Sequence, residues 1–258
     1  MSRLTPMQAH QQRVKAAQAG SATALDEAQR ALQWLHTQRG LLSALASRQT
    51  REAHKAKVLP EITPYLQGVL QADAGAPDPV VAHAAVWAMD AGAWPLALQL
   101  GAYMVRHGLP APDEFKRNAA TLLCDLMADA ALTGSMPAAQ IDGWLSAALS
   151  ITKDADMPDQ TRAKAHKAIA YGLAGKTTLA GQAGDWKGLS DAALRMALDH
   201  LTKAEQLDHN AGVKKDIAAV QKLLTAAADT THSTAADAPP SEPPTKPAAA
   251  PTKRARKT

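Results

Sequence analysis

Apolar side chains recur along this sequence at every third or fourth position, and this spacing constrains the fold more than any other feature. The pattern starts at Leu25, Ala28 and Leu32 and returns at Leu42, within a proline-free stretch of residues 21–58. It matches the period of an α-helix, so it predicts one long amphipathic helix that pairs with another helix for assembly or binds DNA. No segment alternates polar and apolar residues as a strand does. The sequence therefore predicts an all-α fold.

Proline and glycine divide residues 59–225 into further helices. Pro60 and Pro64 are expected to end the long helix, because proline removes a backbone hydrogen bond and clashes with the preceding turn. Two stretches, 80–108 and 190–224, each predict an antiparallel helical hairpin. These hairpins loosely resemble tetratricopeptide units, although their spacing is not regular.

The remaining helices of this domain are expected between its turns. They are predicted at residues 113–132, 137–150 and 159–172, with a glycine-rich loop at 175–188. Alanine dominates the apolar residues and phenylalanine occurs once. Small side chains bury little area each, so thin helical layers or a core shared between chains are expected. The composition leaves both arrangements open.

The two ends of the chain are basic and poor in large apolar side chains. Residues 1–20 are polar with weak periodicity and are interpreted as a flexible basic arm that can include a short helix after Pro6. Residues 226–258 are interpreted as a disordered basic tail, because this stretch cannot bury enough surface to offset the entropy of ordering. Residues 1–57 hold nine Lys and Arg against three Asp and Glu, and the formal net charge is +4. This distribution suits a protein whose extremities contact a polyanion.

Basic side chains are the candidate functional residues, because they neutralise backbone phosphates and give salt-sensitive DNA affinity. The alternative reading is that they form ordinary solvated helix faces. The predicted contacts to double-stranded DNA are Arg3, Arg13, Lys15, Arg48, Arg51, Lys55, Lys57, Arg162, Lys164, Lys167, Lys253, Arg254, Arg256 and Lys257.

Patterns typical of catalysis are weak. Gly175-Lys176-Thr177 lacks the earlier glycine and the preceding strand of a phosphate-binding loop. Asp113 and Glu114, with Lys116, could serve a metal-dependent nuclease, but acidic residues in a first helical turn are also explained by the helix dipole. We therefore assign no catalytic residue, metal ligand or cofactor.

The expected cellular compartment follows from the cysteine content and from the targeting and membrane signals. Cys124 is the one cysteine, so no intramolecular disulfide can form. No signal peptide or membrane span is recognised, and a place in the cytoplasm is expected.

An ordered set of segments resembles the M-type small terminase subunit of temperate tailed myophages, also called the terminase endonuclease subunit. The similarity is collinear over roughly residues 5–225. The segments that carry it are Thr5-Pro6, Arg13-Val14, Leu59-Pro60, Gly68-Val69-Leu70, Trp87 with Asp90 and Gly92, Ala97-Leu98, His107-Gly108-Leu109, Asp156-Met157-Pro158-Asp159, Arg162-Ala163-Lys164, His166-Lys167, Leu207-Asp208 and Ala211-Gly212-Val213-Lys214-Lys215.

The resemblance implies a DNA-recognition subunit that acts in the bacterial host. Such a subunit binds concatemeric viral DNA at the packaging site, assembles into a homo-oligomeric ring, and directs a large ATPase and nuclease subunit. The family label credits the subunit with endonuclease activity, whereas the residues show no catalytic constellation. Two alternatives stay open: a metal-dependent nuclease in its own right, and a helical adaptor that binds only protein.

Overall fold

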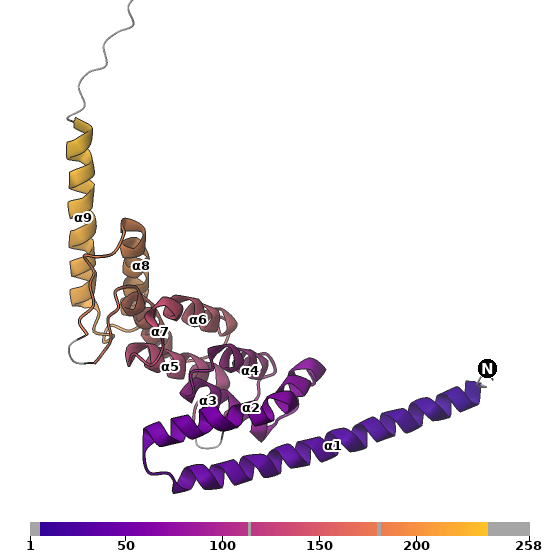
Figure 1. The fold of residues 1–258 in the computed structure, drawn as a ribbon. Helices are drawn as coiled ribbons and strands as arrows, with labels where there is room; N and C mark the ends of the chain where they lie inside the picture. The colour runs from indigo at the N-terminus through magenta and orange to yellow at the C-terminus, as the bar shows by residue number, and fades with distance from the viewer. Residues whose placement is uncertain (1–5, 113–114, 180–181, 237–258) are drawn as a thin grey trace, which may run out of the picture.

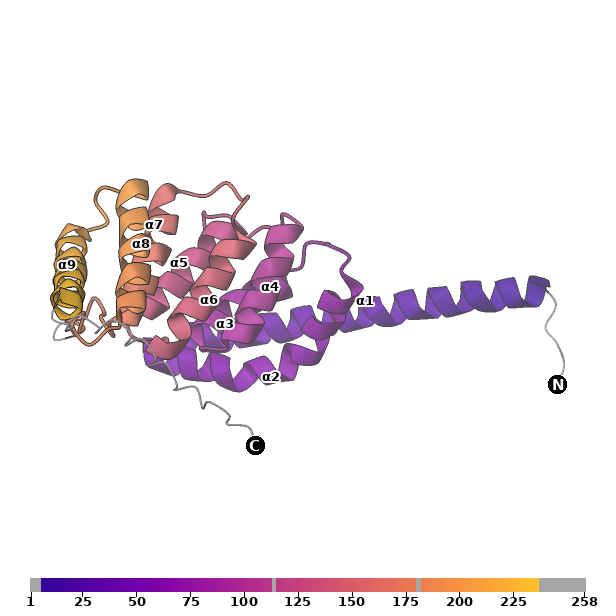
Figure 2. The same ribbon diagram turned by 90° about the horizontal axis from the view of Figure 1, so that it is seen from above.

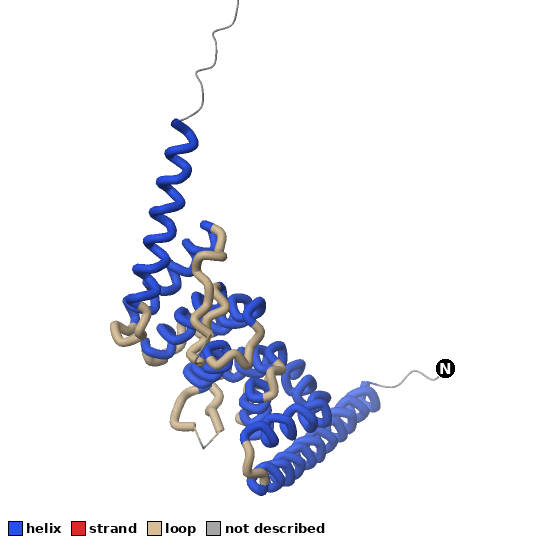
Figure 3. Tube along the Cα trace, turned by 60° about the vertical axis from the view of Figure 1, so that its left-hand side comes forward, coloured by secondary structure: helices blue, strands red, loops and turns tan. Residues whose placement is uncertain are grey.

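The computed structural model describes the backbone of residues 6–112, 115–179 and 182–236, and side chains within these ranges from residue 25 to 227. Over these ranges the chain forms nine α-helices and no strand, which confirms the all-α prediction (Figures 1 and 3). The helices are α1 (Pro6–Ala44), α2 (Arg48–Ala72), α3 (Pro79–Asp90), α4 (Trp94–Arg106), α5 (Ala119–Leu132), α6 (Ala138–Ile151), α7 (Asp159–Leu173), α8 (Asp191–Leu207) and α9 (Lys214–Ala236).

The stretch 21–58 is two helices and not one. Helix α1 ends at Ala44, and α2 begins at Arg48 and runs back along it (Figure 1). The side chain of Ser47 caps α2 by accepting a hydrogen bond from the backbone N–H of Thr50. This cap satisfies one of the unpaired N–H groups at a helix start, which makes a break at this point favourable without proline or glycine.

The expectation that Pro60 and Pro64 end a helix is also wrong, because both lie inside α2. A proline within a helix costs about 3 kcal/mol. Val58, Leu59, Ile62 and Leu66 bury their side chains from the same helix on both sides of the prolines, and α2 packs against α1, α3 and α4. Burial of several aliphatic side chains, at roughly 1.5–3 kcal/mol each, outweighs the penalty.

The chain ends carry more helix than the sequence indicated. From residue 6 onward the arm expected over 1–20 is the first part of α1, and that part extends away from every other helix (Figures 1 and 2). Residues 226–236 of the expected tail are the last turns of α9. Residues 1–5 and 237–258 lie outside the described residues, so the predictions made for them stay predictions.

Helices α3 to α8 form the body of the molecule, and small residues let them approach closely. Ala84, Ala88 and Ala97 are buried at the α3–α4 hairpin, whose bounds match the prediction within a residue or two. A Cβ placed on Gly172 would lie 2.9 Å from the Cβ of Ile141 across the α6–α7 contact. The loose likeness to tetratricopeptide units stays a prediction.

Two other helix starts differ from the sequence interpretation. Helix α5 begins at Ala119, not at residue 113, because the Oδ1 atom of Asn118 accepts a hydrogen bond from the backbone N–H of Thr121 at 2.8 Å. Asp113 and Glu114 lie outside the described residues, and the next helix begins at Ala119, five residues after Glu114. Helix α9 begins at Lys214, after the turn expected to open it near Asn210.

Candidate nucleic-acid interface

The end of α1, the turn after it and the first turn of α2 together carry three arginines and no acidic residue. We call residues 39–51 the hairpin tip; its charged side chains are those of Arg39, Arg48 and Arg51. All three are exposed. Arg48 and Arg51 lie in the first turn of α2, where the helix dipole adds partial positive charge. The tip therefore presents three exposed positive side chains, and the carboxylates of Glu52, Asp90 and Asp129 line one groove beside Arg48.

The contacts of Arg48 and Arg51 leave most of their donors available. Nε of Arg48 donates to Oε1 of Glu52 at 2.6 Å, yet 83% of the Arg48 side chain is exposed. Nε of Arg51 donates to the carbonyl oxygen of Leu45 at 2.7 Å and holds the turn. A guanidinium has five N–H donors in a planar fork. The Glu52 contact also raises the pKa of Arg48, so its charge persists at all working pH values.

Lys55 and Lys57, which follow the tip along α2, have different surroundings. Nζ of Lys55 lies 2.5 Å from Oδ2 of Asp90 on α3, and only 17% of the Lys55 side chain is exposed. Lys57 is exposed. Lys55 thus forms an ion pair between α2 and α3, whereas the side chain of Lys57 is exposed to solvent.

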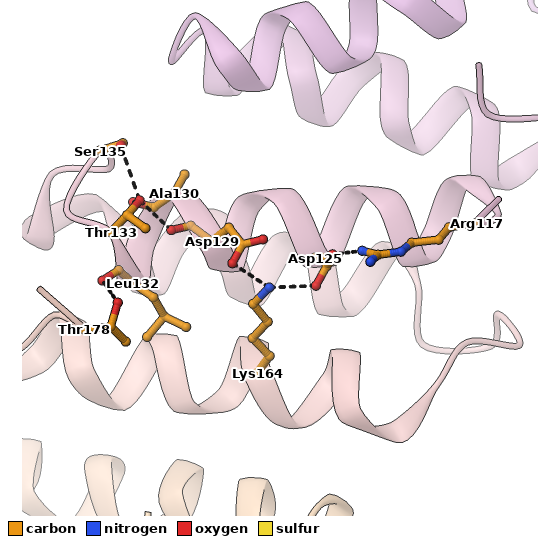
Figure 4. A network of polar contacts seen from close by, with 9 residues as sticks. All are labelled: Arg117, Asp125, Asp129, Ala130, Leu132, Thr133, Ser135, Lys164 and Thr178. Atoms are coloured by element: carbon orange, nitrogen blue, oxygen red, sulfur yellow. Dashed lines mark hydrogen bonds and ion pairs between the residues drawn. The ribbon is translucent and has the colours of Figure 1, made fainter. Parts of the chain in front are cut away.

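The basic cluster predicted on α7 is held by contacts within the chain. Nη2 of Arg162 donates to the carbonyl oxygens of Thr152, at 2.9 Å, and of Ala155, at 2.8 Å, just beyond the end of α6. Nζ of Lys164 lies 2.8 Å from a carboxylate oxygen of Asp125 and 2.5 Å from one of Asp129, both on α5 (Figure 4).

Lys167 is also used internally. Its Nζ donates to the carbonyl oxygen of Ala211 at 2.7 Å, and burial lowers its pKa. All three members of the α7 cluster therefore stabilise helix packing, and DNA contact by Arg162, Lys164 or Lys167 stays a prediction that their geometry does not favour.

The other predicted DNA contacts lie towards the chain ends. Arg13 and Lys15 belong to α1, in its projecting part. The remaining ones lie outside the described residues: Arg3, Lys253, Arg254, Arg256 and Lys257. Sequence reasoning did not select Arg39, although the absence of acidic residues between Glu27 and Glu52 was a usable signal. It also passed over Lys222, which is exposed on α9.

The groups with reactive side chains are placed in structural roles. Nζ of Lys176 lies 2.5 Å from Oδ1 of Asp216 and 4.3 Å from the ring centroid of Tyr171. This ion pair links the loop before α8 to the start of α9. Cys124 is buried, and desolvation raises the pKa of its thiol. Among the described residues, no group of three or more His, Cys, Asp and Glu side chains is arranged to hold a metal ion.

No helix in the described part of the chain is long and apolar enough to cross a lipid bilayer. The fold and this surface define the class: an all-helical protein that carries an exposed, arginine-bearing helical hairpin at one edge.

Comparison with known proteins identifies the family. The family model for the phage small terminase subunit matches residues 32–160, which include the hairpin tip and helices α2 to α6. The chain is also 32% identical over 226 residues to the terminase, endonuclease subunit, of Escherichia phage P2, and the match covers 85% of each chain. No solved structure matches. The chain belongs to the phage small terminase subunit family.

Proposed function

We propose that this chain binds concatemeric viral DNA at the packaging site and directs a large ATPase and nuclease subunit for cleavage and packaging. The observation that carries the proposal is the hairpin tip, where Arg39, Arg48 and Arg51 are exposed and where the Glu52 contact still leaves 83% of the Arg48 side chain accessible. Membership of the small terminase family supports the role in packaging. The site of action is then the cytoplasm of the bacterial host.

The physical basis of the proposed contact is phosphate recognition by arginine. A guanidinium binds phosphate oxygens through two parallel N–H groups, which gives both energy and orientation. Arg48 and Arg51 present such groups from the first turn of a capped helix, so their backbone is fixed before DNA arrives. Lys57 lies farther along the same helix and adds a further positive charge.

The test compares the full chain with a double variant, Arg48→Ala with Arg51→Ala, in binding to packaging-site duplex and to a scrambled duplex over a range of salt concentrations. Each lost phosphate contact should lower the slope of log K against log salt by about 0.9, so the double variant should lose about 2. Affinity at low salt should fall by about tenfold or more. Full retention of slope and affinity would refute the proposed contact.

Arg30→Ala is the matched control. Arg30 is an exposed arginine on α1 that pairs with Asp26, and it lies outside the hairpin tip. Arg30 and Arg48 each pair with a carboxylate four residues away, so the two sites differ in position and not in pairing. Because Arg30 lies away from the tip, its removal should leave DNA affinity nearly unchanged. An equal loss in both variants would indicate a general charge effect and not a contact at the tip.

A second candidate function follows from the name of the phage P2 relative, which describes an endonuclease subunit. Incubation of the full chain with packaging-site DNA and Mg²⁺, without a large subunit, tests it. Cleavage that is abolished by Asp113→Ala with Glu114→Ala would make this chain a nuclease. A chain that binds no DNA at low salt would instead be a protein adaptor.

A further inference from the structure

Over the side chains that the structure describes in α9, the side of the helix that faces away from α8 carries lysines and no acidic residue. Val213 and Val220 are buried where the start of α9 packs on the body. Lys215 and Lys222 are exposed on the opposite side. They are seven residues, or about two helical turns, apart and so point the same way. Small exposed side chains lie between them, and we call the set the α9 face: Lys215, Ala218, Ala219 and Lys222.

The two lysines of the α9 face have no acidic neighbour along their own helix. Side chains three or four residues apart are neighbours on a helix surface, and none at these distances from Lys215 or Lys222 is acidic. Residues 209–227 hold a single acidic residue, Asp216, which is buried and bound by Lys176. The α9 face therefore presents positive charge that its own helix does not neutralise.

The start of α9 is joined to the hairpin tip by a continuous edge of the body. Arg48 of the tip and Ser135, in the turn after α5, line one groove. The backbone N–H of Thr178 donates to the carbonyl oxygen of Leu132 at 2.8 Å, which places the loop before α8 beside the same end of α5. The ion pair between that loop and the first turn of α9 completes the connection. The tip and the first turn of α9 accordingly lie on the same side of the body (Figures 1 and 2).

The groove at this edge is polar and close to neutral. Its carboxylates are paired with basic side chains in three ion pairs, Arg48–Glu52, Lys55–Asp90 and Lys164–Asp129. Ser135 is exposed at the end of α5, and serine hydroxyl groups are common donors to phosphate oxygens. A phosphate backbone can therefore cross this stretch between two basic surfaces.

We propose that a duplex held at the hairpin tip runs along this edge and also contacts the α9 face, where Lys215 and Lys222 bind phosphate oxygens. Lysines two turns apart are about 10 Å apart along the helix axis, which matches about three phosphate steps along one DNA strand. The alanines between them leave no long side chain to hold the backbone away. The choice of ligand rests on the proposed DNA binding, whereas the surface itself is separate from the tip.

Salt titrations of duplex binding by the full chain test the α9 face. Lys215→Ala with Lys222→Ala should lower the slope of log K against log salt by about 1.8, because two phosphate contacts are lost. The affinity advantage of the parent chain should then shrink about tenfold when the salt concentration rises fourfold. Both side chains are exposed, so the free energy of unfolding, measured by chemical denaturation, should be unchanged.

Lys153→Ala with Lys203→Ala is the matched control. It removes the same charge from two exposed lysines, one in the turn after α6 and one on α8, which belong neither to α9 nor to the tip. The slope of this control should match that of the parent chain.

Ala219 tests the approach of the backbone to the α9 face. Ala219→Glu places a carboxylate between the two lysines and should lower the affinity at low salt by about tenfold, because it repels phosphate. Ala219→Gln adds a side chain of the same length without charge and should retain most of the affinity.

Combination with the tip variant tests whether one duplex contacts both surfaces. If it does, the losses add, and a chain in which Arg48, Arg51, Lys215 and Lys222 are all replaced by alanine should lose about 3.6 in slope. If the two surfaces held separate duplexes, the tight site of the α9 variant would keep the parental slope.

Three results would overturn this inference. They are an unchanged slope in the Lys215 and Lys222 variant, an equal loss in the Lys153 and Lys203 control, and losses that do not add in the combined variant. An acidic protein as the ligand of the α9 face would give the first of these. A slope that falls in the tip variant alone removes only this inference, whereas unchanged slopes in both variants remove the proposed DNA contact at the tip as well.

Discussion

Arg162 offers the clearest separation between a structural and a DNA-binding role for a basic residue. Its guanidinium donates to the carbonyl oxygens of Thr152 and Ala155 and, at 3.3 Å, of Lys153. Thr152 is fully buried. Replacement by alanine leaves these carbonyl groups without that donor at the C-terminal end of α6, where a cation also interacts favourably with the helix dipole.

The expected loss can be estimated from these contacts. A hydrogen bond to a charged group contributes about 1.5–3 kcal/mol, and a cation at a helix C-terminus adds about 0.3–1 kcal/mol. Because the three bonds share one group and one of them is long, we expect Arg162→Ala to destabilise the fold by about 2–3 kcal/mol. For a chain of this size, that lowers the melting temperature by roughly 5–10 °C.

The assay pairs chemical denaturation, followed by far-UV circular dichroism at fixed protein concentration, with a DNA titration over salt. Arg162→Ala should lose stability while the salt slope stays that of the parent chain. Lys57→Ala should leave the free energy of unfolding unchanged and lower the slope of log K against log salt by about 0.9. An Arg162→Ala chain of undiminished stability with a reduced slope would show that Arg162 contacts phosphate after all.

The remaining predictions concern packing, pH and the thiol. Gly172→Ala should destabilise the fold by about 1–2 kcal/mol, because the new methyl group meets Ile141. Gly143→Ala, with open space around it, should stabilise the fold by up to about 1 kcal/mol. Equal denaturation midpoints for these two variants would contradict this packing. Burial lowers the pKa of His166 to about 4 and also lowers that of His200. The unfolded chain then binds more protons, so stability should fall as pH drops from about 6.5 to about 4. His166→Gln should flatten that dependence, and a profile identical to the parent's would count against it. Cys124 should react with a thiol reagent only as fast as the chain unfolds.

Helix boundaries set by local signals could be predicted from the sequence. Pro79 and Gly92 bracket α3, and Pro158 precedes α7, so these bounds were predicted within a residue or two. The break before α2 was missed because its signal is one serine, Ser47, within a continuous helical pattern. The prolines of α2 were misread because the burial that compensates for them comes from other helices.

The roles of the basic residues could not be read from local sequence. Lys164 pairs with Asp125, which is 39 residues away, and Lys55 with Asp90, which is 35 residues away. Only the tertiary fold brings these partners together. The sequence supplies the number of positive charges, whereas the structure divides them between internal ion pairs and the exposed hairpin tip.

The ion pair between Lys176 and Asp216 helps to hold α9 on the body of the molecule. Tyr171 of α7 donates a hydrogen bond to Asp216 of α9 at 2.9 Å, and Lys176 binds the same carboxylate. The last helix is thus tied to the body by side chains as well as by its packing on α8. Separation of α9 from the body would therefore break a buried hydrogen bond and an ion pair as well as the packing between α8 and α9.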